Sequence, residues 1–138
     1  VVVDRSHFIT EDEGIYRAVN KYGQKIEAFK LNQKDIAQNN EAIEQEDGDI
    51  KQESRTTTKP QCLLVRPGHV RLKGYDRGFI GGASGRAGST VWFNGDLSAH
   101  PDFCRIIRFI EGCGMKAKWI EGYELTDIGS IIFESENA

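Results

Sequence analysis

Two stretches of this sequence repeat one pattern 91 positions apart, and the repeat limits the folds that are open to the chain. "VVVDRSHFITEDEGIYRAVNKYGQKIEAF" aligns with "VWFNGDLSAHPDFCRIIRFIEGCGMKAKWI", so that Ile15 pairs with Ile106 and Gly23 with Gly114. Each copy reads as a strand, a turn, a helix, a glycine stop and a second strand. Short strands that alternate with helices indicate an α/β fold in which helices cover one face of a sheet.

The repeat also predicts where the helices begin and end. The first is expected to begin at Thr10, a residue that caps helices, and to end at Gly23. The second is expected to begin at Ser98 or Asp102 and to end near Gly114. Further short strands are expected at "CLLVRP", at "VRL" and in the glycine-interrupted "YELTDIGSIIF".

Residues 32–60 differ in composition from the rest of the chain. Seven acids stand there against four bases, and few apolar residues are present. Such a segment buries too little apolar surface to offset the entropy of ordering it. We therefore expect one domain over residues 1–138, interrupted by a disordered acidic insertion at 32–60.

The bulk properties exclude several classes of protein. The length of 138 residues suits one domain, and a net charge of −3 disfavours a general nucleic-acid binder. No apolar run is long enough for a membrane span, and no secretory signal opens the chain. The three cysteines are an odd number without metal-ligand spacing, which favours a reducing, cytoplasmic setting. Because the chain opens on "VVVD" without an initiator Met, we expect a trimmed chain or the back part of a longer one.

The glycine-rich segment "GFIGGASG" meets neither common nucleotide-binding pattern. It lacks the Lys-Ser/Thr of the P-loop, and its spacing is not that of the dinucleotide GxGxxG. Two interpretations remain open. Gly81, Gly82 and Ser84 form a nest of N–H groups for a ligand carboxylate or another anion, or the glycines only permit bends at a sheet edge.

The next polar cluster, "FNGDLSAHPD", lies at a junction between a strand and a helix. It holds Asn94, Asp96, His100 and Asp102. At such a junction, polar side chains and helix N–H groups converge on ligands, and an imidazole beside carboxylates suits proton transfer. The alternative is a capping turn in which the aspartates only accept backbone hydrogen bonds.

The last cluster, "LTDIGS", places Asp127 and Ser130 in an otherwise apolar strand. A buried aspartate without a partner is costly, so Asp127 either ends the strand or faces a polar centre. Neither this cluster nor the others shows a metal-ligand spacing or a cofactor motif. The sequence therefore predicts neither a metal nor another cofactor.

These segments resemble the back half of an uncharacterised bacterial domain family of the guanidino-group-modifying-enzyme (pentein) fold. The resemblance rests on "VDRSHFITEDEGIYRAV", "VRPGHVRLKGYDRGFIGGASG", "FNGDLSAHPD" and "LTDIGSII", and spans nearly the whole chain apart from residues 32–60. It implies a pentein-like α/β propeller of ββαβ-type blades around a polar channel. With blades in residues 1–31 and 61–138, the propeller would be an incomplete one of two to three blades, so either an N-terminal half is missing or several copies assemble.

The resemblance also bears on function. Active enzymes of that fold use a nucleophilic cysteine near the C-terminus, whereas no cysteine follows Cys113 here, so the thiol chemistry is not carried over. We expect a protein that binds a small cationic metabolite, a guanidino or amine compound, held by Asp96 and Asp127. If it is an enzyme, a hydrolase or transferase is expected, with His100 moving the proton. The alternatives are a non-catalytic structural or protein-interaction module, and an acidic tether at 32–60 for a basic partner.

Overall fold

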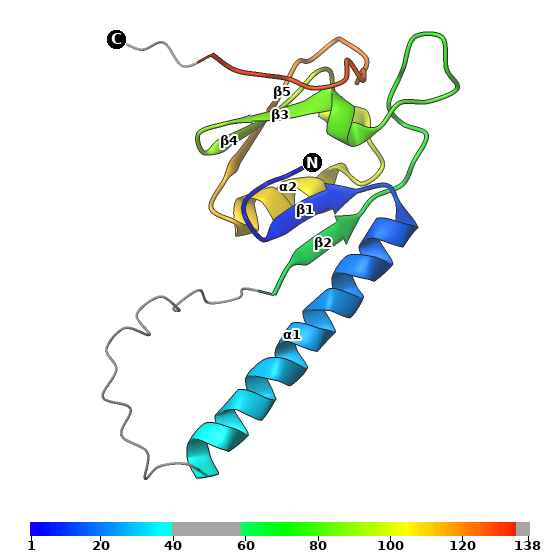
Figure 1. The fold of residues 1–138 in the computed structure, drawn as a ribbon. Coiled ribbons are helices and arrows are strands. Elements are labelled where there is room, and N and C mark those ends of the chain that lie inside the picture. The colour runs from blue at the N-terminus through cyan, green and yellow to red at the C-terminus, as the bar shows by residue number, and fades with distance from the viewer. Residues whose placement is uncertain (40–58, 135–138) are drawn as a thin grey trace.

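The structure is a computed structural model that describes residues 1–39 and 59–134, arranged as in Figure 1. Its elements are β1 (His7–Thr10), α1 (Glu13–Asn39), β2 (Gln61–Leu64), the 3-10 helix η2 (Ile80–Ala83), β3 (Ser84–Ala87), β4 (Thr90–Phe93), the 3-10 helix η3 (Leu97–Ala99), α2 (Phe103–Gly112) and β5 (Lys116–Trp119).

The structure contains two β-α-β units with parallel strands, and each overlaps one copy of the sequence repeat. β1 pairs with β2, His7 opposite Gln61, and α1 lies between them in the chain. β4 pairs with β5, Thr90 opposite Lys116, and α2 lies between those two. β3 adds to β4 in antiparallel register, which gives a two-stranded and a three-stranded sheet. The predicted mixed α/β class is confirmed.

The first helix does not end at Gly23 as the repeat predicts, and no strand follows at residues 25–29. α1 continues through Gly23 to Asn39, and the second strand of this β-α-β unit is β2, outside the first copy of the repeat. Gly23 is buried in the helix, where an added Cβ would approach the side chain of Lys59 to 3.1 Å. Gly114, at the matching position of the second copy, has a φ of +74° and follows α2 as predicted.

The insertion predicted at residues 32–60 is described only at its ends. Residues 32–39 complete α1, where disorder was expected, and residues 59–60 lead into β2. Lysine, glutamine and alanine in this part favour a helix, so the helix extends beyond the apolar pattern of its first turns. The rest of the prediction, at residues 40–58, lies outside the described residues.

The helix caps differ in detail from the sequence prediction. Asp12 caps α1, its Oδ1 accepting from the N–H of Ile15 at 3.0 Å. The predicted cap, Thr10, instead accepts from the N–H of Asp12 at 3.1 Å. Asp102 occupies the N-cap position of α2, but its side chain makes no capping hydrogen bond.

The core joins both sheets to α2. Figure 1 shows α2 close to β1, whereas most of α1 extends away from the sheets. One cluster of buried apolar side chains connects these elements, and it includes Val3, Ile9, Val65, Val91, Phe93, Leu97, Ile106 and Ile110. α2 contributes the last two, which lie four residues apart on one helical face.

Two of the predicted strands are absent. "VRL" and "YELTDIGSIIF" meet only in an isolated bridge between Arg71 and Thr126, closed by hydrogen bonds from Arg71 N to Leu125 O and from Asp127 N to Arg71 O. Within residues 1–39 and 59–134 the two sheets do not close into a propeller. The described helices include none with the length and apolar character needed to cross a membrane.

Candidate functional site

A cleft of about 500 Å³, here called the His100 cleft, opens between loops that follow three strands. One loop follows β2, one follows β4 and one follows β5. In α/β sheets, ligands bind beyond the carboxyl ends of the strands, because loops from separate strands meet there. The cleft is lined by residues 68–71, Asp76, Asp96, residues 99–100 and residues 122–125.

Asp96 reaches the cleft because of the turn at Gly95. Gly95 is buried with a φ of +131°, and an added Cβ would overlap the backbone of Glu124 and Leu125. The N–H of Asp96 then donates to the carbonyl of Tyr123 at 2.6 Å, which joins two walls of the cleft. Within the described residues, the hydrogen bonds of the Asp96 carboxylate are from Ser98 and go to Oδ1. Oδ2 is therefore left for a ligand.

His100 is held in one tautomer. Its Nδ1 accepts from the N–H of Asp102 at 3.0 Å, so the neutral ring carries its proton on Nε2. Burial, and then the nearby charge of His69, lower the pKa of His100, which keeps the ring neutral at pH 7. The side chain is only 4% exposed, and its Nε2 has no hydrogen-bond partner among the described residues. A residue of the cleft lining thus carries a buried N–H donor that no described residue accepts.

Asp102 lies beside His100 but serves the adjacent loop. Its Oδ2 accepts from the backbone N–H of Arg66 at 2.8 Å, and its Oδ1 accepts from the guanidinium of Arg105 at 3.1 Å. Burial by itself would raise the pKa of Asp102, but these two arginines and their hydrogen bonds lower it below its usual value. Asp102 does not line the cleft. Its hydrogen bond with Arg66 N fixes the start of the loop that carries His69.

The other predicted site residues gather apart from the cleft. Asp127 accepts from Phe79 N at 2.9 Å and from Gly129 N at 2.8 Å, and an added Cβ on Gly82 would overlap its carboxylate. Ser84 Oγ donates to the carbonyl of Gly81 at 3.2 Å. These contacts hold the glycine segment against the loop after β5, which matches the structural interpretation of "GFIGGASG".

Asn94 and Ser130 also lie outside the cleft lining. Asn94 Nδ2 donates to the carbonyl of Thr126 at 3.0 Å, and Ser130 is exposed. Of the nine predicted site residues, the structure thus brings Asp96 and His100 together in the cleft.

Two acidic residues of the cleft, from the loops after β2 and β5, were not predicted from the sequence. Asp76 and Glu124 line the cleft with Asp96, and Arg71 pairs with Glu124 at 3.2 Å. Three carboxylates, one guanidinium and two imidazoles, those of His69 and His100, therefore line the cleft, and His100 is neutral. Carboxylates outnumber the guanidinium in the lining, which suits a ligand that carries a cationic group.

Comparison with known proteins gives a family but no described activity. A family model described as "Family of unknown function (DUF6873)" matches residues 35–132. This range includes every residue that lines the His100 cleft. No curated protein and no solved structure matches the chain.

Proposed function

This chain belongs to the family of unknown function DUF6873, and we propose that it binds a small cationic metabolite, a guanidino or amine compound, in the His100 cleft. One observation carries the proposal. Asp96 and His100 line the same cleft as two further carboxylates, Asp76 and Glu124, and Nε2 of His100 is buried and unpaired among the described residues.

The chemistry of the wall indicates which ligand groups would be recognised. A guanidinium or ammonium group forms charge-assisted hydrogen bonds with carboxylates, and Oδ2 of Asp96 is available for one of them. The Nε2–H of His100 needs an acceptor, which a cation alone does not provide. A ligand that carries a cationic group and a carbonyl or carboxylate oxygen satisfies both.

We assign His100 the role of hydrogen-bond donor and propose no turnover. A general base needs a free ring nitrogen, but Nδ1 already accepts from Asp102 N and Nε2 carries the proton. This hydrogen bonding of the ring supports binding without catalysis.

We also propose that the β-α-β units are arranged as in the pentein fold. This arrangement is supported by the two β-α-β units, each with a parallel strand pair and each in its own sheet. Such units are what a propeller blade contributes. Completing a propeller requires further chain or further copies.

Asp96→Asn is expected to weaken binding of arginine at least tenfold, about 1.4 kcal/mol. Asparagine keeps the Oδ1 that accepts from Ser98, so the turn is retained while the negative charge is lost. Isothermal titration calorimetry measures the affinities, with citrulline as the uncharged analogue. Glu111→Gln, an exposed change outside the cleft lining, is the matched control. Equal affinities in the two variants, or no saturable binding of any cation, would contradict the proposal.

A second candidate function, self-association, is favoured by one surface of α1. Ile15, Tyr22 and Phe29 lie seven residues apart and are each more than half exposed. Apolar residues at heptad spacing form one stripe along a helix and suit pairing with a second copy. Phe29→Glu is then expected to convert a dimer to a monomer in analytical ultracentrifugation. An unmodified chain that sediments as a monomer at about 100 μM would exclude a dimer of useful strength.

A further inference from the structure

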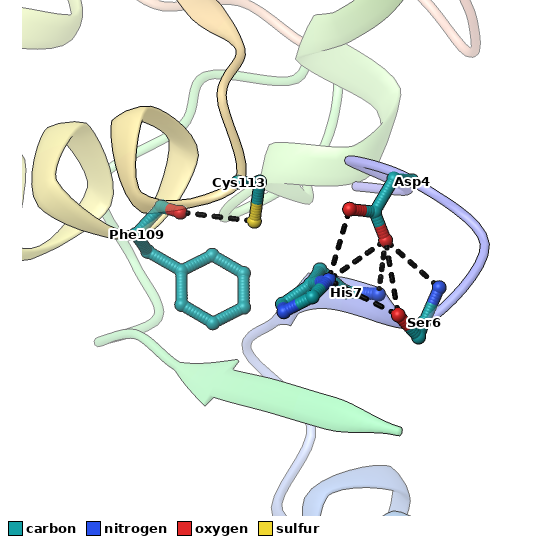
Figure 2. A network of polar contacts seen from close by, with 5 residues as sticks. All are labelled: Asp4, Ser6, His7, Phe109 and Cys113. Atoms are coloured by element: carbon teal, nitrogen blue, oxygen red, sulfur yellow. Dashed lines mark hydrogen bonds and ion pairs between the residues drawn. The ribbon is translucent and has the colours of Figure 1, made fainter. Parts of the chain in front are cut away.

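We propose that Asp4, His7 and Cys113 form a binding site for one Zn²⁺ ion, separate from the His100 cleft. Figure 2 shows the three side chains near one another, Asp4 from the loop before β1, His7 from the first residue of β1 and Cys113 from the end of α2. One ligand atom from each residue lies within 4.8 Å of the other two. None of the three lines the cleft, so this inference stands apart from the proposed function.

The Asp4 side of the site is held by a tight turn. Oδ1 of Asp4 accepts from the N–H groups of Ser6 and His7 at 2.8 and 2.9 Å. The imidazole Nδ1 of His7 lies 2.8 Å from the same oxygen and 2.9 Å from Oδ2. The ring also packs edge-on against Phe109, with centroids 5.7 Å apart. The carboxylate and the imidazole are therefore fixed before any metal binds, which lowers the entropic cost of binding.

The thiol comes from the other end of the fold. Cys113 is the C-cap residue of α2, and its Sγ donates to the carbonyl of Phe109 at 3.2 Å. Phe109 thus contacts the thiol through its carbonyl and the imidazole through its ring. All three ligand residues are half-buried, so they are shielded from water but remain reachable by a small ion.

The donor set selects the metal. Thiolate, imidazole and carboxylate together suit zinc, whereas Ca²⁺ and Mg²⁺ prefer oxygen ligands alone. Tetrahedral zinc, with bonds of about 2.0 to 2.3 Å, places its ligand atoms about 3.5 Å apart. Small side-chain movements bring atoms that lie within 4.8 Å to that spacing. The thiol proton passes to solvent as the metal binds, and one coordination position remains for water.

The same three residue types suggest a catalytic triad, but the thiol is poorly placed for it. Burial, and then the negative charge of Asp4, raise the pKa of the Cys113 thiol. The thiol proton is donated to a carbonyl rather than to His7. The hydrogen bond of the thiol therefore does not prepare a nucleophile paired with His7.

Calorimetric titration of the full chain with Zn²⁺ tests the proposal, with Co²⁺ as the spectroscopic probe. We expect one equivalent to bind and an absorption band from thiolate-to-Co²⁺ charge transfer. Asp4→Asn is expected to weaken Zn²⁺ binding at least tenfold. The band is expected to disappear in Cys113→Ser and to persist in Cys104→Ser, which removes an exposed thiol of the same helix.

A Cys62→Ser/Cys104→Ser variant keeps the test independent of how Cys113→Ser folds. Cys113 is then the one cysteine left in the sequence, and the Co²⁺ band is expected to remain. The proposal is overturned if this variant or the unmodified chain lacks the band, or if a folded Cys113→Ser retains it. Zinc that binds without a thiolate band would place the ion elsewhere, and that result also overturns it.

Discussion

Gly95→Ala is expected to lower the free energy of unfolding by about 3 to 5 kcal/mol, through backbone strain and overpacking together. The φ of +131° lies in a region that side chains with a Cβ rarely adopt. An added methyl group would also lie 2.5 Å from the carbonyl oxygen of Glu124 and closer still to Leu125 Cα. Those backbone atoms cannot move without opening the cleft wall, because Asp96 N donates to the carbonyl of Tyr123 beside them.

Gly88→Ala is the matched control for this prediction. Gly88 has a φ of +57°, but an added Cβ would meet no atom within 4 Å. Its cost is that of a left-handed alanine alone, about 1 kcal/mol. Urea unfolding followed by tryptophan fluorescence measures both variants. Equal losses would mean that the backbone angle, and not the close approach to Glu124, decides the cost at Gly95.

The sequence repeat predicted where α2 ends but not where α1 ends. Gly23 and Gly114 occupy the same position of the repeat, yet only Gly114 takes the left-handed conformation that ends a helix. Glycine is also tolerated inside a helix where a neighbour packs closely, as Lys59 does at Gly23. One sequence does not distinguish these two uses, since the neighbour lies 36 positions further along the chain.

The site residues that lie close together in the sequence were predicted, and those that come from separate loops were missed. Asp96 and His100 belong to one short segment between β4 and α2, so their proximity is visible in the sequence. Asp76 and Glu124 reach the same cleft only because the loops after β2 and β5 meet. The pairing of Arg71 with Thr126 creates that meeting, and the strand signal in "VRL" does not say which segment it pairs with.

The ligands of the proposed metal site lie even further apart in the sequence, so the sequence alone does not indicate that they meet. Spacing rules for zinc look for ligands a few residues apart, and the sequence offers no such pattern around its cysteines. Asp4 and Cys113 lie near opposite ends of the described chain and meet because α2 packs close to the start of β1. Tertiary packing brings these residues together. A spacing rule applied to the sequence does not detect them, and the sequence therefore predicted no metal.

Asp102→Ala is expected to lower the free energy of unfolding by about 3 kcal/mol. Asp102 is 1% exposed, and its carboxylate satisfies the N–H of Arg66 and the guanidinium of Arg105. Alanine leaves that backbone N–H without its acceptor and leaves a small cavity under the loop. Asp102→Asn retains an acceptor oxygen but not the charge, so its loss is expected to be smaller, about 1 to 2 kcal/mol. Urea unfolding of both variants at pH 7 separates the hydrogen bond from the charge.

The charge contribution of Asp102 should also depend on pH in a defined direction. Because the pKa of Asp102 is lowered in the folded chain, its stabilising effect is present above the ordinary aspartate value of about 3.9. It is lost as the pH falls through the lower, folded value. The stability difference between the unmodified chain and Asp102→Asn should therefore stay constant from about pH 7 to 5 and shrink below about pH 4. A difference that disappears well above the aspartate range would instead assign the effect to the neighbouring His100, because protonation of Nδ1 breaks its hydrogen bond with Asp102 N.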